Sequence, residues 1–263
     1  MGKKSNQAEQ ESGTVGGKKL KPGKILGIII LSVLLVILIP VISGIVSGVK
    51  QVKEWNDAVD ATLSEIKSGG VNYTYQTHAT LTEPGGSPVA TDIEYHIDGY
   101  AYKIVSPADG VEYRVYEDGK LVRYTYNESS GKYSKSTAAA TEEAFLKERN
   151  DIADKSGITG IIASLKNTAG LFEEKDGEYF LNNEKAGEEF KKGFVSGLAA
   201  SGDVDFDSEN FVFSLKFEEN KLTKIYLKLK YTVEGQGLWD MEIQWTLGGA
   251  TVEIPTDSEI ETI

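Results

Sequence analysis

The stretch "FVFSLKFEENKLTKIYLKLKY", residues 211–231, alternates apolar and polar side chains along two runs that a polar break separates. A period of two is typical of a β-strand with one covered face and one solvated face. The break at Glu219 and Asn220 predicts a hairpin between the two runs. The apolar face then presses against the protein's own core, a membrane or a lipid. On that face lie Phe211, Phe213, Leu215, Phe217, Ile225, Leu227, Leu229 and Tyr231.

The same alternation predicts further strands on both sides of this hairpin. They are expected within residues 71–81, 92–104, 110–133 and 238–247. Asp98-Gly99 and Asp118-Gly119 supply the turn chemistry that hairpins require. Two shorter strands are expected in "GEYFL", residues 177–181, and in "ATVEIP", residues 250–255, where the proline ends the strand.

Apolar residues at helical spacing predict helices around and between these strands. In residues 51–68 the pattern includes Trp55, for which core packing is expected, and Gly69-Gly70 ends the helix. Thr141 is an expected N-cap for a second helix. In residues 182–198, an apolar stripe four residues apart includes Phe190 and Phe194.

This order of elements predicts an α+β fold in one domain. The architecture expected is a large, strongly curved antiparallel sheet, a half-barrel, with helices packed on its concave face. The expected divisions are a juxtamembrane helix at 50–70, an extracytoplasmic domain at 71–256 and a tail at 257–263.

Residues 25–49 contain no charged side chain, and as a helix they would cover roughly 37 Å. The hydrocarbon core of a bilayer is about 30 Å thick, so one transmembrane helix is predicted. A cleaved signal peptide is the alternative, but its apolar region usually runs only about 7–15 residues. Lysines before the span place the N-terminus in the cytoplasm. The prediction is a single-pass cell-membrane protein with a disordered basic tail at 1–24 and its remaining chain outside.

The charge is divided unevenly along the chain. Residues 1–24 hold six lysines and two glutamates, a net charge of +4. Because the whole chain has a net charge of −12, the remaining residues carry −16. An acidic body of this kind repels phosphate backbones, so no nucleic acid partner is expected.

No catalytic, cofactor-binding or metal-binding residue is predicted. The chain has no cysteine, which excludes disulfides and thiol chemistry. The acidic run at 203–209 lacks the glycine and the final glutamate of an EF-hand loop, so a solvated loop is expected. His78 and His96 share the polar face of their strands, but two histidines without a further ligand or nucleophile are weak support for a site.

The aromatic residues of the strands are the most informative feature. They form either an ordinary packed core or the wall of a half-open cavity for an acyl chain or another hydrophobe. The residues expected to line such a cavity are Phe190, Phe194, Phe211, Phe213, Leu215, Phe217, Leu227, Leu229, Trp239, Ile243 and Trp245.

The order of the elements, the segment "YFLNNEKAGEEFKKGF" before a long final meander and the ending "TVEIP" resemble one bacterial superfamily. It contains the lipoprotein carriers and the LppX-type proteins. The resemblance covers roughly residues 52–256 and implies a half-barrel whose concave face can hold lipid. Carriers are soluble or tethered through a lipidated cysteine, whereas this chain has no cysteine. The carriers' functional arginine has no counterpart in a matching motif, so no functional residue is transferred.

Three functions follow as hypotheses. The first is a non-enzymatic, membrane-tethered module that binds a lipid or other hydrophobe. The second is an interaction or sensing domain with a packed core that meets a protein or cell-wall partner through its outer surface. The third is a hydrolase, which the absence of GxSxG, P-loop and dinucleotide motifs disfavours.

Overall fold

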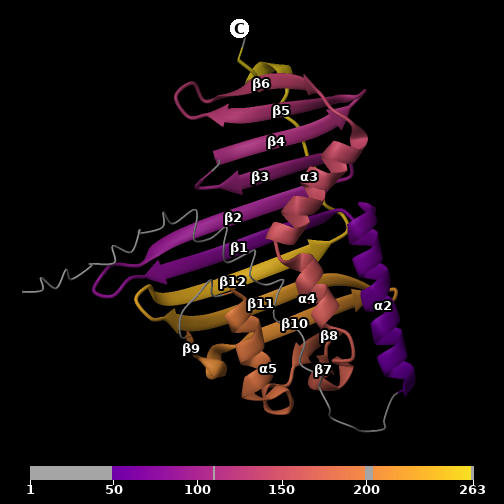
Figure 1. Cartoon of the computed structure of the whole chain (residues 1–263), viewed down its shortest axis with the longest axis vertical. Coiled ribbons are helices and arrows are strands. Elements are labelled where there is room, and N and C mark those ends of the chain that lie inside the picture. The colour runs from indigo at the N-terminus through magenta and orange to yellow at the C-terminus, as the bar shows by residue number, and fades with distance from the viewer. Residues whose placement is uncertain (1–48, 109, 199–203, 262–263) are drawn as a thin grey trace, which may run out of the picture.

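A computed structural model describes residues 49–108, 110–198 and 204–261 of the chain (Figure 1). The predicted tail at 1–24, and all but the last residue of the predicted span at 25–49, lie outside the described residues. Among the helices that are described, none combines the length and the apolar character that crossing a bilayer requires.

Twelve antiparallel strands form one sheet, in the order β6-β5-β4-β3-β2-β1-β12-β11-β10-β8-β7, with β9 paired to β11 beside this path. The hairpin of residues 211–231 is confirmed as β10 and β11. The strands are β1 (Tyr73–Thr82), β2 (Val89–Asp98), β3 (Ala101–Ser106), β4 (Gly110–Glu117), β5 (Lys120–Asn127), β6 (Lys132–Ala139), β7 (Phe172–Lys175), β8 (Glu178–Leu181), β9 (Val204–Phe206), β10 (Val212–Glu218), β11 (Lys221–Val233) and β12 (Gly237–Leu247).

The α-helices of the described residues lie over one face of this sheet, as Figure 1 shows. The described chain is therefore a large antiparallel sheet with few helices, which confirms the predicted α+β class. The helices are α2 (Val49–Ser68), α3 (Glu142–Lys155), α4 (Ile158–Ser164) and α5 (Asn183–Leu198), with short 3₁₀ turns η2 (Ala169–Leu171), η3 (Ser208–Asn210) and η4 (Asp257–Glu259).

Local chemistry places most of the boundaries where the sequence predicts them. Thr141 caps α3, because its side chain accepts a hydrogen bond from the backbone N–H of Ala144. Gly69 ends α2 with a φ of 80°, a left-handed conformation that glycine adopts without steric cost. Glu219 and Asn220 form the β10–β11 turn with φ values of 50° and 61°.

The predicted closing strand at 250–255 is wrong, since these residues contain no strand. Side chains, not a neighbouring strand, bond to this segment. The Asn72 amide donates to the carbonyl of Ala250 over 3.3 Å, and the N–H of Val252 donates to the Asp98 carboxylate over 3.3 Å. The segment therefore runs as irregular chain.

The register of the central strands brings large side chains into rows on the helix-covered face. Tyr75 on β1 lies opposite both Tyr95 on β2 and Trp245 on β12. Its ring centroid lies 5.3 Å from that of Tyr95 and 5.4 Å from that of Trp245. Aromatic pairs at these distances add stability beyond the area they bury.

On the strands at the β6 end, charged as well as apolar residues face the helices. On β4 and β5, Glu112 and Arg123 face the helices, while Tyr113 and Tyr124 lie together on the other face. The C-terminal segment passes beside these tyrosines, and a pocket of about 360 Å³ lies between residues 251–256 and Tyr113. Both faces of the sheet are therefore covered in part, by different segments.

Candidate ligand site between the sheet and its helices

The structure gathers the residues predicted as cavity lining into one apolar interior. Nine of them are buried there, and Phe217 is half-buried and packs against them. Phe194 belongs to α5, but its side chain falls outside the described part of the chain. The nine are Phe190, Phe211, Phe213, Leu215, Leu227, Leu229, Trp239, Ile243 and Trp245.

Trp55 packs α2 against this interior, which confirms the prediction that Trp55 is a core residue. Its ring lies 5.2 Å from Phe172, 5.6 Å from Tyr179 and 4.9 Å from Phe217, measured between ring centroids. Its indole N–H donates to the backbone carbonyl of Leu165 over 2.6 Å. This helix is therefore fastened to both the sheet and the end of α4.

The other two tryptophans differ from Trp55 in one respect. The indole nitrogens of Trp239 and Trp245 are buried and have no hydrogen-bond partner among the described residues. An indole N–H can only donate, so only an acceptor can satisfy it. A buried donor without a partner costs about 1–3 kcal/mol, and native structures contain few of them.

Trp239 has a second incompletely paired donor beside it. It lies opposite Tyr231 across the β11–β12 ladder, with the two rings nearly parallel at 15° and their centroids 6.5 Å apart. The Tyr231 hydroxyl donates to the Met241 sulfur over 3.6 Å, and a thioether is a weak acceptor. Burial raises the pKa of Tyr231, and no charged neighbour contributes to that shift.

Helix α5 covers the part of the sheet near this pair. It packs against β9, whose Phe206 pairs with Tyr231 across the ladder. Gly187 interrupts the helix with a φ of 68° and a ψ of 169°. The cover is therefore two shorter helical pieces joined at a break.

Two of the predicted lining residues also border described pockets outside the interior. Phe217 borders a pocket of about 110 Å³ beside Trp55. Ile243 borders a groove of about 340 Å³ on the face without α-helices. A larger pocket of about 620 Å³ lies where the end of α2 meets the β10–β11 turn.

The groove on the face without α-helices has both polar and apolar residues in its lining. Gln76, Gln244 and Glu242 line it, and so does the pair of His78 and Asp92, whose Nδ1 and Oδ1 atoms are 2.7 Å apart. His96 lies elsewhere, because it pairs with Thr74 while His78 pairs with Asp92. The structure therefore does not bring the two histidines together.

The acidic run at 203–209 is used locally as far as it is described. The Asp207 carboxylate caps η3 by accepting from the N–H groups of Glu209 and Asn210. Hydrogen bonding, mainly from the Asn210 side chain, lowers the pKa of Asp207. No cluster of three acidic or histidine side chains suited to a metal occurs among the residues described.

Buried charged groups were not predicted from the sequence, and two of them, Arg149 and Glu112, join separate elements. Arg149 on α3 is 3% exposed and donates to the carbonyls of Gly69, at 2.9 Å, and Gly99, at 3.0 Å. Burial lowers the pKa of its guanidinium. Its partners are 80 and 50 residues away in the chain, so no local signal identifies them.

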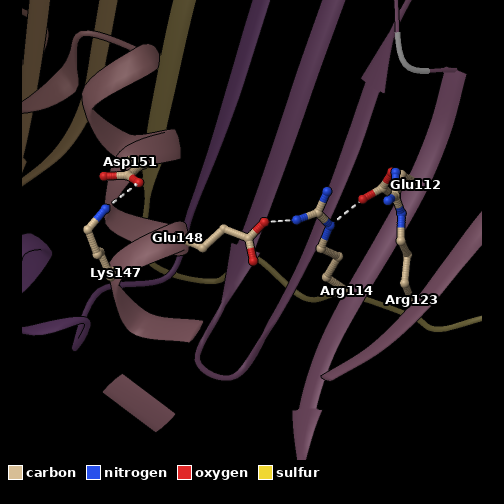
Figure 2. A network of polar contacts seen from close by, with 6 residues as sticks. All are labelled: Glu112, Arg114, Arg123, Lys147, Glu148 and Asp151. Carbon is tan, nitrogen blue, oxygen red and sulfur yellow. Dashed lines mark hydrogen bonds and ion pairs between the residues drawn. The ribbon is translucent and has the colours of Figure 1, made fainter. Parts of the chain in front are cut away.

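Glu112 is the second buried charged group, and Figure 2 shows the network around it. Its carboxylate accepts from both Arg114 and Arg123, and Arg114 also pairs with Glu148 on α3. The Glu112 side chain is 3% exposed. This chain of ion pairs joins α3 to the middle of β4.

No protein-family model matches this chain, and no curated protein matches it. Among solved structures it is similar to the ywiB protein from Bacillus subtilis, with 11% identity and a TM-score of 0.20 over 68% of this chain and 93% of that one. It is also similar to a DUF1329 family protein from Desulfovibrio piger, with 13% identity and a TM-score of 0.23 over 78% of this chain and 95% of that one. Similarity at this level supports no statement about function.

Proposed function

We propose that this protein is a membrane-anchored, extracytoplasmic binding module that holds a lipid or another hydrophobe between its sheet and its helices. The observation that carries the proposal is the interior itself. Large apolar side chains from β10, β11 and β12 form one surface beneath separate helices, and two tryptophan donors within it are unsatisfied. Ligand pockets are mostly apolar with a few placed polar groups, which is the composition found here.

The anchor and the finer architecture belong to the same proposal. The apolar run at 25–49 tethers the chain, and the lysine-rich tail stays in the cytoplasm. The helix-covered face is the concave side of a half-barrel, as in the lipoprotein-carrier superfamily that the sequence resembles. Binding there requires no catalysis, cofactor or metal.

Native mass spectrometry tests this function. Residues 49–263 contain every described element, and circular dichroism establishes first that this fragment is folded. We expect a population with the added mass of a co-purified lipid, or uptake of a fluorescent fatty acid after delipidation. A folded fragment that shows only the apo mass and takes up no probe would contradict the proposal.

A specific observation favours a second candidate function, an interaction domain for a cell-wall polymer. The 340 Å³ groove on the opposite face is lined by the amides of Gln76 and Gln244, by the carboxylates of Asp92 and Glu242 and by the ring of Tyr226. Amides and carboxylates bond readily to hydroxyl groups, and the carboxylates repel anionic polymers. An uncharged glycan therefore fits this groove best.

Co-sedimentation with purified cell wall separates this candidate from the first. Binding that falls severalfold in Gln76→Ala and Gln244→Ala, and is unchanged in Trp239→Phe, would support the groove. Equal sedimentation of all three variants would exclude it.

A further inference from the structure

The pocket of about 360 Å³ beside the C-terminal segment lies on the face of the sheet without α-helices. Three of its lining residues form a row of direct neighbours across adjacent strands: His96 on β2, Lys103 on β3 and Tyr113 on β4. Tyr133 on β6 also borders it. Ligand pockets usually measure about 300–1,000 Å³, so this pocket suits a small molecule.

The C-terminal segment forms the other wall of the pocket and is fixed on both sides of it. On one side, the N–H of Val252 donates to the Asp98 carboxylate over 3.3 Å. On the other side, the N–H of Glu261 donates to the Tyr133 carbonyl over 2.8 Å. The pocket is therefore bounded by chain that hydrogen bonds hold in place.

Lys103 is the most informative side chain of this pocket. It is half-buried, but it forms no ion pair with the described residues. Its ammonium lies 5.6 Å from the centroid of the Tyr113 ring, and a ring face attracts a cation without neutralising it. The other described lysine side chains that are buried or half-buried all have a carboxylate partner, and they are Lys191, Lys216, Lys224, Lys228 and Lys230. A partly desolvated cation without such a partner favours an anionic ligand.

Two carboxylates border the same pocket from the C-terminal segment. The carboxylate of Glu259 already accepts from the N–H of Thr256 over 2.8 Å and from its hydroxyl over 2.7 Å. Glu253 has no hydrogen bond or ion pair within the described part of the chain, with Lys103 or with any other residue. A cation and an anion therefore face one pocket without pairing with each other.

The charges of the lining select among small ligands. Lys103, Glu253 and Glu259 give it a formal charge of −1, and His96 is paired, since its Nε2 lies 2.9 Å from the Glu94 carboxylate. This balance repels a dianion such as phosphate, and Lys103 repels a bare cation. A hydrocarbon would bury both unpaired charges without a partner. A molecule that carries one ammonium and one carboxylate can meet both.

We infer that this pocket binds a small zwitterion of the amino-acid type, with its carboxylate against Lys103 and its ammonium against Glu253. A free amino acid and a dipeptide share this chemistry and differ in the distance between their two charges. The inference goes beyond the proposed function, because the pocket and the apolar interior lie on opposite faces of the sheet.

Isothermal titration calorimetry of the full-length chain in nanodiscs tests the inference, with empty nanodiscs as the blank. Four probes are compared. L-alanine and L-alanyl-L-alanine carry both charges, N-acetyl-L-alanine carries only the carboxylate, and L-alaninamide carries only the ammonium. We expect the better of the two zwitterions to bind about tenfold more tightly than either singly charged probe.

Variants assign the binding to the two charges. Lys103→Met should lower the affinity of the zwitterion about tenfold, to that of L-alaninamide, and Glu253→Gln should lower it to that of N-acetyl-L-alanine. Lys103→Arg keeps the positive charge and should keep the binding. Lys135→Met is the matched control, because Lys135 also lies over a tyrosine ring, 5.5 Å from the centroid of Tyr124, but does not line the pocket. It should leave every affinity unchanged.

Three results would overturn the inference. The first is a wild-type protein that binds neither zwitterion. The second is binding of N-acetyl-L-alanine as tight as that of the zwitterions, because the ammonium would then have no role. The third is an equal loss of binding in Lys103→Met and Lys135→Met, because the pocket would then not be the site. None of these results alters the test of the proposed function, which measures uptake of a hydrophobe.

Discussion

At the scale of single residues, Arg149 is a buried cation whose described partners are carbonyl oxygens. It donates to the last turn of α2 through Gly69 and to the β2–β3 turn through Gly99. No acidic side chain pairs with it among the described residues. The residue therefore joins α3, the end of α2 and the β2–β3 turn at one point.

Replacing Arg149 by Met should destabilise the protein by about 2–4 kcal/mol. Hydrogen bonds from charged donors are worth about 1.5–3 kcal/mol each, and removing a buried charge returns part of its desolvation cost. Urea unfolding measures the change. Lys147→Met on the same helix is the control, because Lys147 makes only an exposed pair with Asp151 and should cost less than about 1 kcal/mol. Equal effects of the two variants would contradict the role of Arg149.

Gly69 should be intolerant of a side chain for the same reason. A Cβ atom there would lie 2.3 Å from the Arg149 guanidinium, and the backbone is left-handed with a φ of 80°. Gly85 has a similar φ of 74° but nothing within 4 Å of its Cβ position. Gly85→Ala should cost about 1–2 kcal/mol from strain alone. Gly69→Ala should cost more, and Arg149→Met should remove the excess in a double-mutant cycle.

At the scale of elements, the ion pairs in Figure 2 fasten α3 to the β6 end of the sheet. Glu112 pairs with two arginines, so Glu112→Gln leaves Arg123 without a described acidic partner and Arg114 with Glu148 alone. Losing the charge-assisted hydrogen bonds from these partly exposed arginines costs about 1.5–3 kcal/mol. We expect a loss of this size in urea unfolding, and faster hydrogen exchange in α3. Asp151→Asn, which breaks only the exposed pair with Lys147, should change the free energy of unfolding by less than about 0.5 kcal/mol.

The C-terminal turn should respond to pH. Hydrogen bonds from Thr256 lower the pKa of Glu259 below its usual 4.5, within the capping box of η4. A lowered folded-state pKa contributes stability that is present above pH 4.5 and is lost as the pH falls through the folded value. The N–H of Glu261, which donates to the Tyr133 carbonyl over 2.8 Å, should therefore lose hydrogen-exchange protection on acidification below pH 4.5. Glu259→Ala, which removes the acceptor, should show weak protection at all pH values.

At the scale of the whole molecule, the position of α2 defines which end faces the bilayer under the proposed anchoring. Trp55, near the start of α2, contacts Phe172 and Tyr179 on β7 and β8. Figure 1 places β6 at the opposite end of the molecule. Under that proposed anchoring, we expect the β7–β8 turn to be near the membrane and the β5–β6 turn to be distant from it.

The absence of cysteine makes this orientation measurable. A fluorophore on Asp176→Cys in the β7–β8 turn should be quenched by a lipid-headgroup quencher. The same fluorophore on Ser130→Cys in the β5–β6 turn should be quenched much less. Equal quenching at both sites, or failure of an impermeant maleimide to label either site on intact cells, would contradict the orientation.

The sequence predicted the central strands well, because a period of two assigns each residue to a face once the strand is recognised. Trp239 and Trp245 were placed inside for that reason. The same rule does not identify the inward face of β4, where Glu112 faces the helices and Tyr113 does not. The partners of Arg149, and the unpaired state of the tryptophans, depend on segments brought together only by the whole fold. Residues 250–255 have strand-like composition, but side chains of Asn72 and Asp98 take the bonds that a ladder would need.

The contacts of Trp55 also restrict how α2 can move relative to the sheet. Helix α2 begins at the end of the apolar run and is fixed to the rest of the domain at two points, by Trp55 near its start and by Arg149 beyond its last turn. It therefore cannot rotate independently of the sheet. In a tethered protein, α2 would then act as a rigid rod about 30 Å long, and any tilt of this helix relative to the membrane would tilt the whole sheet with it.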